Sequence, residues 1–125
     1  MITRYSRKEL TDIWSEHNKY QIWLDVEIAA AEGMEKLGTI PKGVASAVRK
    51  KAKINVNRIH NIEAKVKHDV IAFLTSVTEK VGIKARYLHQ GMTSSDVVDT
   101  SFNIQLIQSG KILVKDIDQL SLIHI

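Results

Sequence analysis

The last third of the chain follows a single helical pattern without a break. From Thr93 onward, apolar residues recur at steps of three, four and seven, which predicts one long helix to the end of the sequence. Helices in globular domains average about 11–12 residues, and a stripe this long needs a partner that a 125-residue chain is too short to supply. We therefore expect either pairing with other copies of this helix or a chain that is the front part of a longer protein. The predicted stripe consists of Val98, Phe102, Leu106, Leu113, Ile117 and Leu120.

Start and stop signals divide the preceding residues into shorter helices. Ser6 and Glu9 have the spacing of a capping box, which predicts that the first helix is capped by Ser6. A second helix ends at Gly38, where a left-handed cap fits, and Pro41 follows shortly after. The predicted apolar stripe of this second helix consists of Trp23, Val26, Ala30, Met34 and Leu37.

Three more short helices are predicted before the long one. They cover residues 44–52, a segment that starts near Asn55, and residues 69–80, after which Gly82 ends the pattern. Residues 83–92 show no period and contain Gly91, which predicts a connecting loop. We therefore predict an all-α fold, in which residues 1–92 form a helical N-terminal domain and residues 93–125 begin a long bundle helix.

Composition excludes several classes of protein. Hydrophobic residues make up 44% and charged residues 26%, as in ordinary globular proteins, so wholesale disorder is not expected. The absence of cysteine excludes disulfides, thiolate metal sites and a cysteine nucleophile. No apolar run approaches the roughly 18 residues of a membrane span, and no secretory signal is visible. We expect a cytoplasmic protein without a membrane partner.

The motifs predict neither a metal nor a cofactor. The five histidines lack metal-ligand spacing, and no glycine-rich phosphate loop occurs. The net charge of +4 would suit an anionic partner, but the basic residues at positions 49–53 lack interleaved aromatic residues and any nucleic-acid motif. We interpret that basic run as a solvated helix end and expect no nucleic-acid partner.

Two short polar clusters precede predicted helices. In the N-terminal cluster, Arg4 and Tyr5 offer a guanidinium and a phenol that suit a phosphate beside a helix N-terminus. In the central cluster, His68 lies between the cation of Lys67 and the anion of Asp69, and imidazole is the side chain that most often acts in proton transfer. Taken alone, each cluster is explained more simply, by a surface arginine with a packed tyrosine and by a structural histidine at a helix start.

A third group, the hydroxyl cluster, covers residues 89–100. Gly91 lets the backbone turn closely, and Thr93, Ser94 and Ser95 then stand at the start of the long helix. Hydroxyls together with free backbone N–H groups form a receptor for a carboxylate. A single hydroxyl would suffice for a helix cap, so three in a row, preceded by His89, favour a binding function.

These clusters carry a resemblance to a known family. The sequence resembles the N-terminal part of the bacterial-type adenylosuccinate lyases, in the fumarase/aspartase superfamily, over nearly its whole length up to about residue 120. The TSSD run of residues 93–96 is shared by several superfamily members, whereas its combination with KHDVIAF and an initial RYS is far narrower. The matching segments are ITRYS at 2–6, IW at 13–14, WL at 23–24, KHDVIAF at 67–73 and HQGMTSSDVVDT at 89–100.

The resemblance implies a reaction and a set of binding residues. The family releases fumarate by β-elimination from adenylosuccinate, giving AMP, and from a succinyl-carboxamide ribotide earlier in purine synthesis. By that pattern Arg4 and Tyr5 hold the phosphate, and the central cluster lines the nucleotide site, although many members have arginine where Lys67 stands. Thr93 and Ser94 bind the succinyl carboxylates. The auxiliary catalytic residues implied are His68 and His89.

The same resemblance implies that part of the machinery lies elsewhere. In the family, the histidine acid and the serine base belong to later motifs that have no counterpart in these 125 residues. Family members are more than three times as long, form homotetramers and build each active site from three subunits. We therefore expect an inactive fragment of such a lyase. The alternative is a non-catalytic helical module for self-association or adaptor binding.

Overall fold

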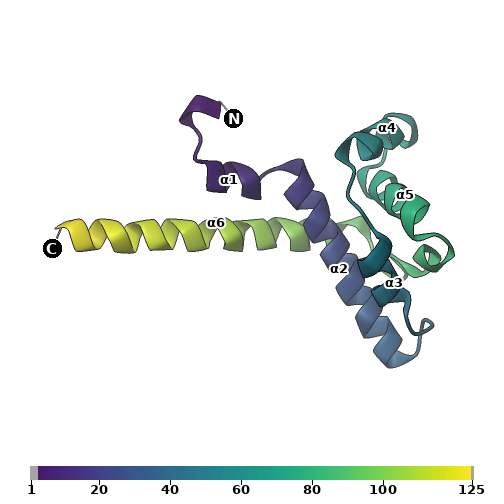
Figure 1. The fold of residues 1–125 in the computed structure, drawn as a ribbon. Helices are drawn as coiled ribbons and strands as arrows, with labels where there is room; N and C mark the ends of the chain where they lie inside the picture. Colours follow the sequence, from purple (N-terminus) through teal and green to yellow (C-terminus); the bar gives the residue numbers. More distant parts are fainter. Residues whose placement is uncertain (1–2, 125) are drawn as a thin grey trace.

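A computed structural model describes residues 3–124, and every regular element within that range is helical (Figure 1). The predicted all-α class is confirmed. No helix in the described range combines the length and the apolarity that crossing a bilayer requires. The elements are the 3-10 helix η1 (Thr3–Tyr5), α1 (Lys8–Ile13), α2 (Glu16–Leu37), α3 (Val44–Lys51), α4 (Val56–Val66), α5 (Asp69–Val81), the 3-10 helix η2 (Ile83–Tyr87) and α6 (Ser94–His124).

The core lies where α2 packs between the α3–α5 group and the first half of α6. Its centre is an aromatic cluster in which Trp23 meets Tyr20 and Phe73 edge to face, at centroid distances of 5.2 and 5.5 Å. Tyr20 and Phe73 in turn stack at 6.1 Å. All three rings are almost wholly buried, and such ring pairs add about 0.5–1.5 kcal/mol each beyond the area that they bury.

Local signals mark several helix boundaries correctly, but not the start of α1. Gly38 caps α2 in the left-handed region, at φ 74°, as predicted. The helix predicted to start near Asn55 is α4, and the Asn55 side chain caps it. The N-cap of α1 is Arg7 and not Ser6, and no side chain caps that helix. Because α1 begins one residue later than the capping box requires, Glu9 accepts a hydrogen bond from the Arg7 guanidinium at 2.8 Å instead of closing the box.

Three further expectations need correction. The predicted loop over residues 83–92 contains the helix η2, whose Ala85 and following Leu88 are buried in the core. The second helix starts earlier than its apolar pattern shows, because Ser15 caps it by accepting a hydrogen bond from the Asn18 backbone N–H at 3.2 Å. Its predicted stripe is also rotated, since Leu37 is 80% exposed. The residues of α2 that are buried are Tyr20, Ile22, Trp23, Leu24, Glu27, Ile28 and Ala31.

The long helix α6 docks through a polar face and leaves most of its apolar face uncovered. Its buried residues recur every fourth position: Val97, Ser101, Gln105 and Ser109. The Trp23 indole N–H donates to the Ser101 hydroxyl at 2.8 Å, and the Gln105 amide donates to the Ile13 carbonyl at 2.8 Å. The predicted stripe is therefore not the face packed on this chain: from Phe102 to Leu120 its members are 44–64% exposed.

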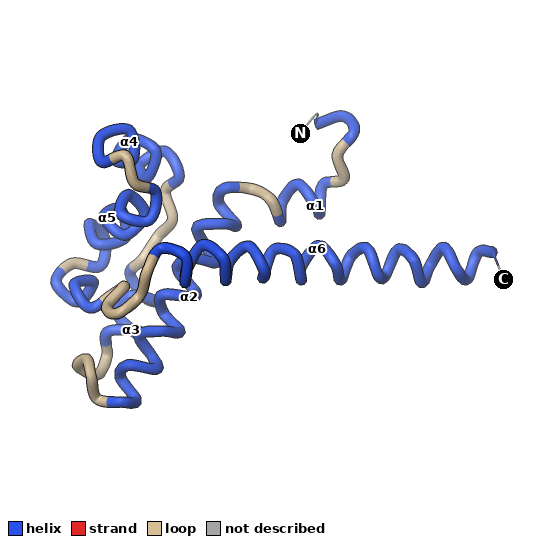
Figure 2. The backbone as a smooth tube through the Cα atoms, turned by 180° about the vertical axis from the view of Figure 1, so that it is seen from behind, coloured by secondary structure: helices blue, strands red, loops and turns tan. Residues whose placement is uncertain are grey.

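The second half of α6 projects beyond the rest of the molecule, as Figures 1 and 2 both show. Only α1 and the N-terminal segment accompany it, and an ion pair from Arg7 to Asp116 ties this segment to the projecting part. The predicted start of the long helix is confirmed to within one residue, at Ser94. The division into two domains between residues 92 and 93 stays a prediction.

Candidate functional site

The N-terminus of α6 presents free hydrogen-bonding groups. The Asp96 carboxylate accepts from the Thr93 backbone N–H at 2.8 Å, and the Asp96 N–H donates to the Thr93 carbonyl at 3.1 Å. Within residues 3–124, no hydrogen bond engages the hydroxyls of Thr93 and Ser94. Since the first N–H groups of a helix also lack intrahelical partners, this end of α6 has the donors that an anionic group requires.

His89, the first residue of the hydroxyl cluster, holds a strained backbone conformation. It adopts φ 61°, in the left-handed region that side chains other than glycine seldom enter. Its backbone N–H and its ring Nδ1 contact the two carboxylate oxygens of Glu27, at 2.9 and 2.6 Å. Glu27 lies in the middle of α2 and is only 1% exposed. The loop before α6 is therefore held to α2 through a buried carboxylate.

The central cluster forms the turn between α4 and α5. Lys67 ends α4 in the left-handed region, at φ 57°. His68 is the N-cap of α5: its Nδ1 accepts from the Ile71 backbone N–H at 3.4 Å and lies 3.5 Å from the Asp69 carboxylate. The simpler structural role considered for this histidine is thus present. The side chains of His68 and Asp69 are also about half exposed, so a ligand can reach them.

The surroundings of that turn are not strongly positive. A surface hollow of about 380 Å³ is lined by His60, Glu63, Ala64 and Lys67, so its lining holds one formal cation and one carboxylate. Burial, aided by carboxylates that include Asp69, raises the pKa of the Tyr20 phenol to about 12. A phosphate at this turn would need positive charge from another segment to balance the carboxylates.

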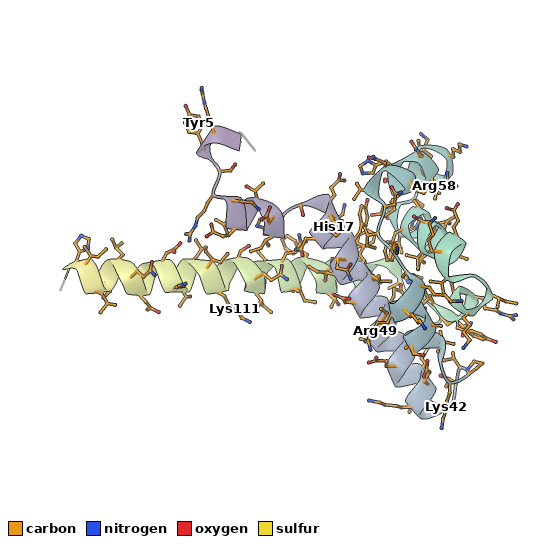
Figure 3. The ribbon with its side chains drawn as sticks, in the orientation of Figure 1. Tyr5, His17, Lys42, Arg49, Arg58 and Lys111 are labelled. Carbon is orange, nitrogen blue, oxygen red and sulfur yellow. The ribbon has the colours of Figure 1, made fainter. Side chains whose placement is uncertain are left out.

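The N-terminal cluster lies apart from the other two. Tyr5 is 75% exposed, and the Arg4 guanidinium lies 4.7 Å from the centre of its ring, a cation–π contact at the surface. Figure 3 shows Tyr5 on the N-terminal segment beyond α1, well away from α4 and α5. The prediction of a tyrosine packed beneath the first helix is wrong, because the segment projects away from the core.

Within one chain the three clusters do not form a single pocket. Among residues 3–124, no hydrogen bond or ion pair joins a predicted site residue of one cluster to one of another. The described range also holds no group of three or more histidine and acidic side chains placed to share a metal ion. The clusters therefore offer three separate sets of anion-binding groups on one polypeptide.

Sequence reasoning missed Glu27. The predicted stripe of α2, which runs from Trp23 to Leu37, does not include position 27. Glu27 follows Trp23 by four residues and precedes Ala31 by four, and this spacing places it on the buried face. An acidic residue in register with buried positions was the signal available.

Comparison with known proteins gives three findings. A family model described as Lyase matches residues 3–123. Adenylosuccinate lyase of Streptococcus mutans serotype c (strain ATCC 700610 / UA159) is 47% identical over 118 residues, which are 94% of this chain and 27% of that protein. The crystal structure of fumarate lyase from Mesorhizobium sp. BNC1 matches with a TM-score of 0.75 at 22% identity, covering 88% of this chain and 27% of that one. The chain thus spans about a quarter of the length of the curated relative, and the structural likeness shows the fold.

Proposed function

The chain belongs to the lyase family of the fumarase/aspartase superfamily, and on this basis we propose that it is part of an adenylosuccinate lyase. The reaction is the β-elimination of fumarate from adenylosuccinate and from the succinyl-carboxamide ribotide, in the cytoplasm and without a metal or cofactor. The observation that carries the proposal is the 47% identity to the S. mutans adenylosuccinate lyase over 94% of this chain. At such identity over almost every residue, a shared reaction is better supported than a shared fold alone.

The clusters suit the successive needs of this chemistry. Elimination develops negative charge on the succinyl carboxylates, which donors already in place stabilise without reorganisation. The free hydroxyls of Thr93 and Ser94 at the start of α6 supply such donors. The phosphate end would be held by Arg4 and Tyr5, whose exposure leaves both side chains open to a ligand. These roles place each cluster against a different part of one nucleotide.

A composite site explains why the clusters are apart in a single chain. The turn that bears Lys67, His68 and Asp69 has little excess positive charge, whereas the N-terminal cluster provides an exposed guanidinium far from it. Assembly between subunits would bring an arginine from one chain to the turn of another. The principal acid and base would likewise come from polypeptide beyond these residues, so we expect no turnover from this chain by itself.

A chimera tests the proposal directly. This chain replaces the matching 118 residues of the S. mutans enzyme, and fumarate release from adenylosuccinate is followed by absorbance. We expect an active chimera that loses at least about 100-fold of kcat/KM on His68→Ala or on the double change Thr93→Ala and Ser94→Ala. Lys50→Ala, on the basic end of α3, serves as the matched surface control. An inactive but folded chimera, or one indifferent to these changes, would refute the proposal.

The uncovered face of α6 supports a homo-oligomer, a tetramer by family resemblance. A contiguous apolar stripe along an exposed helix marks a protein interface. Light scattering after size exclusion should show the chimera as an oligomer, which Leu113→Glu and Ile117→Glu together disrupt. The alternative, a non-catalytic self-association module, would keep the oligomer while the chimera fails to release fumarate.

A further inference from the structure

Glu27 is the one charged residue that is buried within residues 3–124. Its side chain has no exposed surface, and its partners are the backbone N–H and the ring Nδ1 of His89. An isolated buried carboxylate is costly, and this one has no lysine or arginine to neutralise it among its hydrogen-bond partners. Among the described residues, its hydrogen bonds therefore come from His89 alone.

The geometry decides which ring nitrogen of His89 meets a ligand. A carboxylate accepts hydrogen bonds, so the 2.6 Å contact commits a proton to the side of the ring that bears Nδ1. Nε2 is then the ring nitrogen that remains for a ligand. It accepts a hydrogen bond when the His89 ring is neutral and donates one when the ring also carries a proton on Nε2. The second carboxylate oxygen holds the backbone N–H of the same residue, which stabilises its left-handed conformation. One buried side chain thus fixes both the tautomer and the position of His89.

We propose that Glu27 is a positioning residue of the lyase site, which orients His89 so that Nε2 faces the succinyl group bound at the hydroxyl cluster. This role rests on the proposed function, because it assumes that His89 meets substrate. It extends that function to a residue in the middle of α2 that touches no ligand itself. The relation resembles the general one in which an acidic side chain holds the second nitrogen of a working histidine.

The first test needs no substrate. Nitrogen-15 NMR of the imidazole in the purified chain reports which ring nitrogen carries the proton. We expect Nδ1 of His89 to be protonated in the unaltered chain, and Glu27→Gln to shift the ring toward the Nε2–H tautomer that free histidine prefers. Glu32→Gln, on the same helix in a surface pair with Arg49 at 2.8 Å, is the matched control and should leave the ring signals in place. An unaltered chain with Nδ1 unprotonated would overturn the proposal, even if the Glu27 variant fails to fold.

The second test separates positioning from mere structural support. In the chimera, Glu27→Gln should lower kcat/KM by at least about 10-fold, the lower end of the loss seen when a metal-bound histidine loses the partner of its second nitrogen. Combined with His89→Asn, it should cost no more than His89→Asn alone, because Glu27 acts through that ring. Additive losses, or a loss of less than about twofold from Glu27→Gln, would overturn the role. An inactive chimera with the unaltered chain would instead refute the proposed function and leave the NMR result standing.

Discussion

The docking of α6 through a polar face makes a sharp prediction at Ser101. Its hydroxyl accepts from the Trp23 indole N–H at 2.8 Å and donates to the Val98 carbonyl at 2.9 Å, in a site that is almost wholly buried. Ser101→Ala removes the acceptor and leaves a buried N–H unpaired, which costs about 1–3 kcal/mol. The better helix propensity of alanine returns roughly 0.5 kcal/mol. We expect a net loss of about 1–2 kcal/mol and a fall in Tm of roughly 3–8 °C.

Ser109 provides the control on the same face of the same helix. It is buried, and its hydroxyl has no hydrogen-bond partner. Ser109→Ala should therefore raise stability by at least about 0.5 kcal/mol, since it removes an unpaired polar atom and improves helix propensity. Urea and thermal unfolding followed by circular dichroism, at several protein concentrations, measure both variants.

A double-mutant cycle isolates the hydrogen bond itself. In a Trp23→Phe background no indole N–H remains to be stranded, so Ser101→Ala should become neutral or slightly stabilising, a coupling of about 1–2 kcal/mol. If Ser101→Ala and Ser109→Ala change stability in the same direction by similar amounts, hydrogen bonds do not determine how stably this face of α6 packs, and the reasoning is wrong.

The remaining predictions concern helix ends and pH. Gly38→Ala should lower the free energy of unfolding by about 1–2 kcal/mol, because φ is 74° at that position. Gly33→Ala, in open space inside α2, should raise it by roughly 1 kcal/mol. Thermal unfolding of both variants separates backbone strain from helix propensity. The backbone N–H of Ala45, with others at the start of α3, lowers the pKa of Glu35. Because its folded pKa lies below the unfolded value of about 4.3, this group stabilises the fold above that value and ceases to do so as the pH falls through the folded pKa. Glu35→Gln should therefore lower the urea midpoint near neutral pH. It should also reduce the fall in stability between neutral and acid pH. If that fall is the same in the variant, Glu35 is not the group responsible for it.

The candidate site residues stand at helix boundaries that the sequence indicates, and the roles that the family resemblance gives them stay predictions. His68 and Thr93 occupy the starts of α5 and α6, where polar side chains and free N–H groups coincide, and the spacing of motif residues is read directly from the chain. Glu27 escaped notice for a physical reason. A helical period shows which residues share a face of a helix. It does not show that the buried carboxylate of Glu27 is hydrogen-bonded by a residue 62 positions away.

The sequence by itself determined the helical class, the left-handed end of α2 at Gly38, the start of α4 near Asn55 and the start of the long helix. The boundaries among these depend on neighbours within about one turn. Only the tertiary structure decided which face of α6 is buried. Hydrophobicity favoured the stripe through Phe102, yet Ser101 and Gln105 lie inward, because the Trp23 N–H and the Ile13 carbonyl must be paired once buried. Those partners lie 78 and 92 residues away along the chain, where no local periodicity can reveal them. The apolar stripe of α6 therefore faces outward and not toward the core.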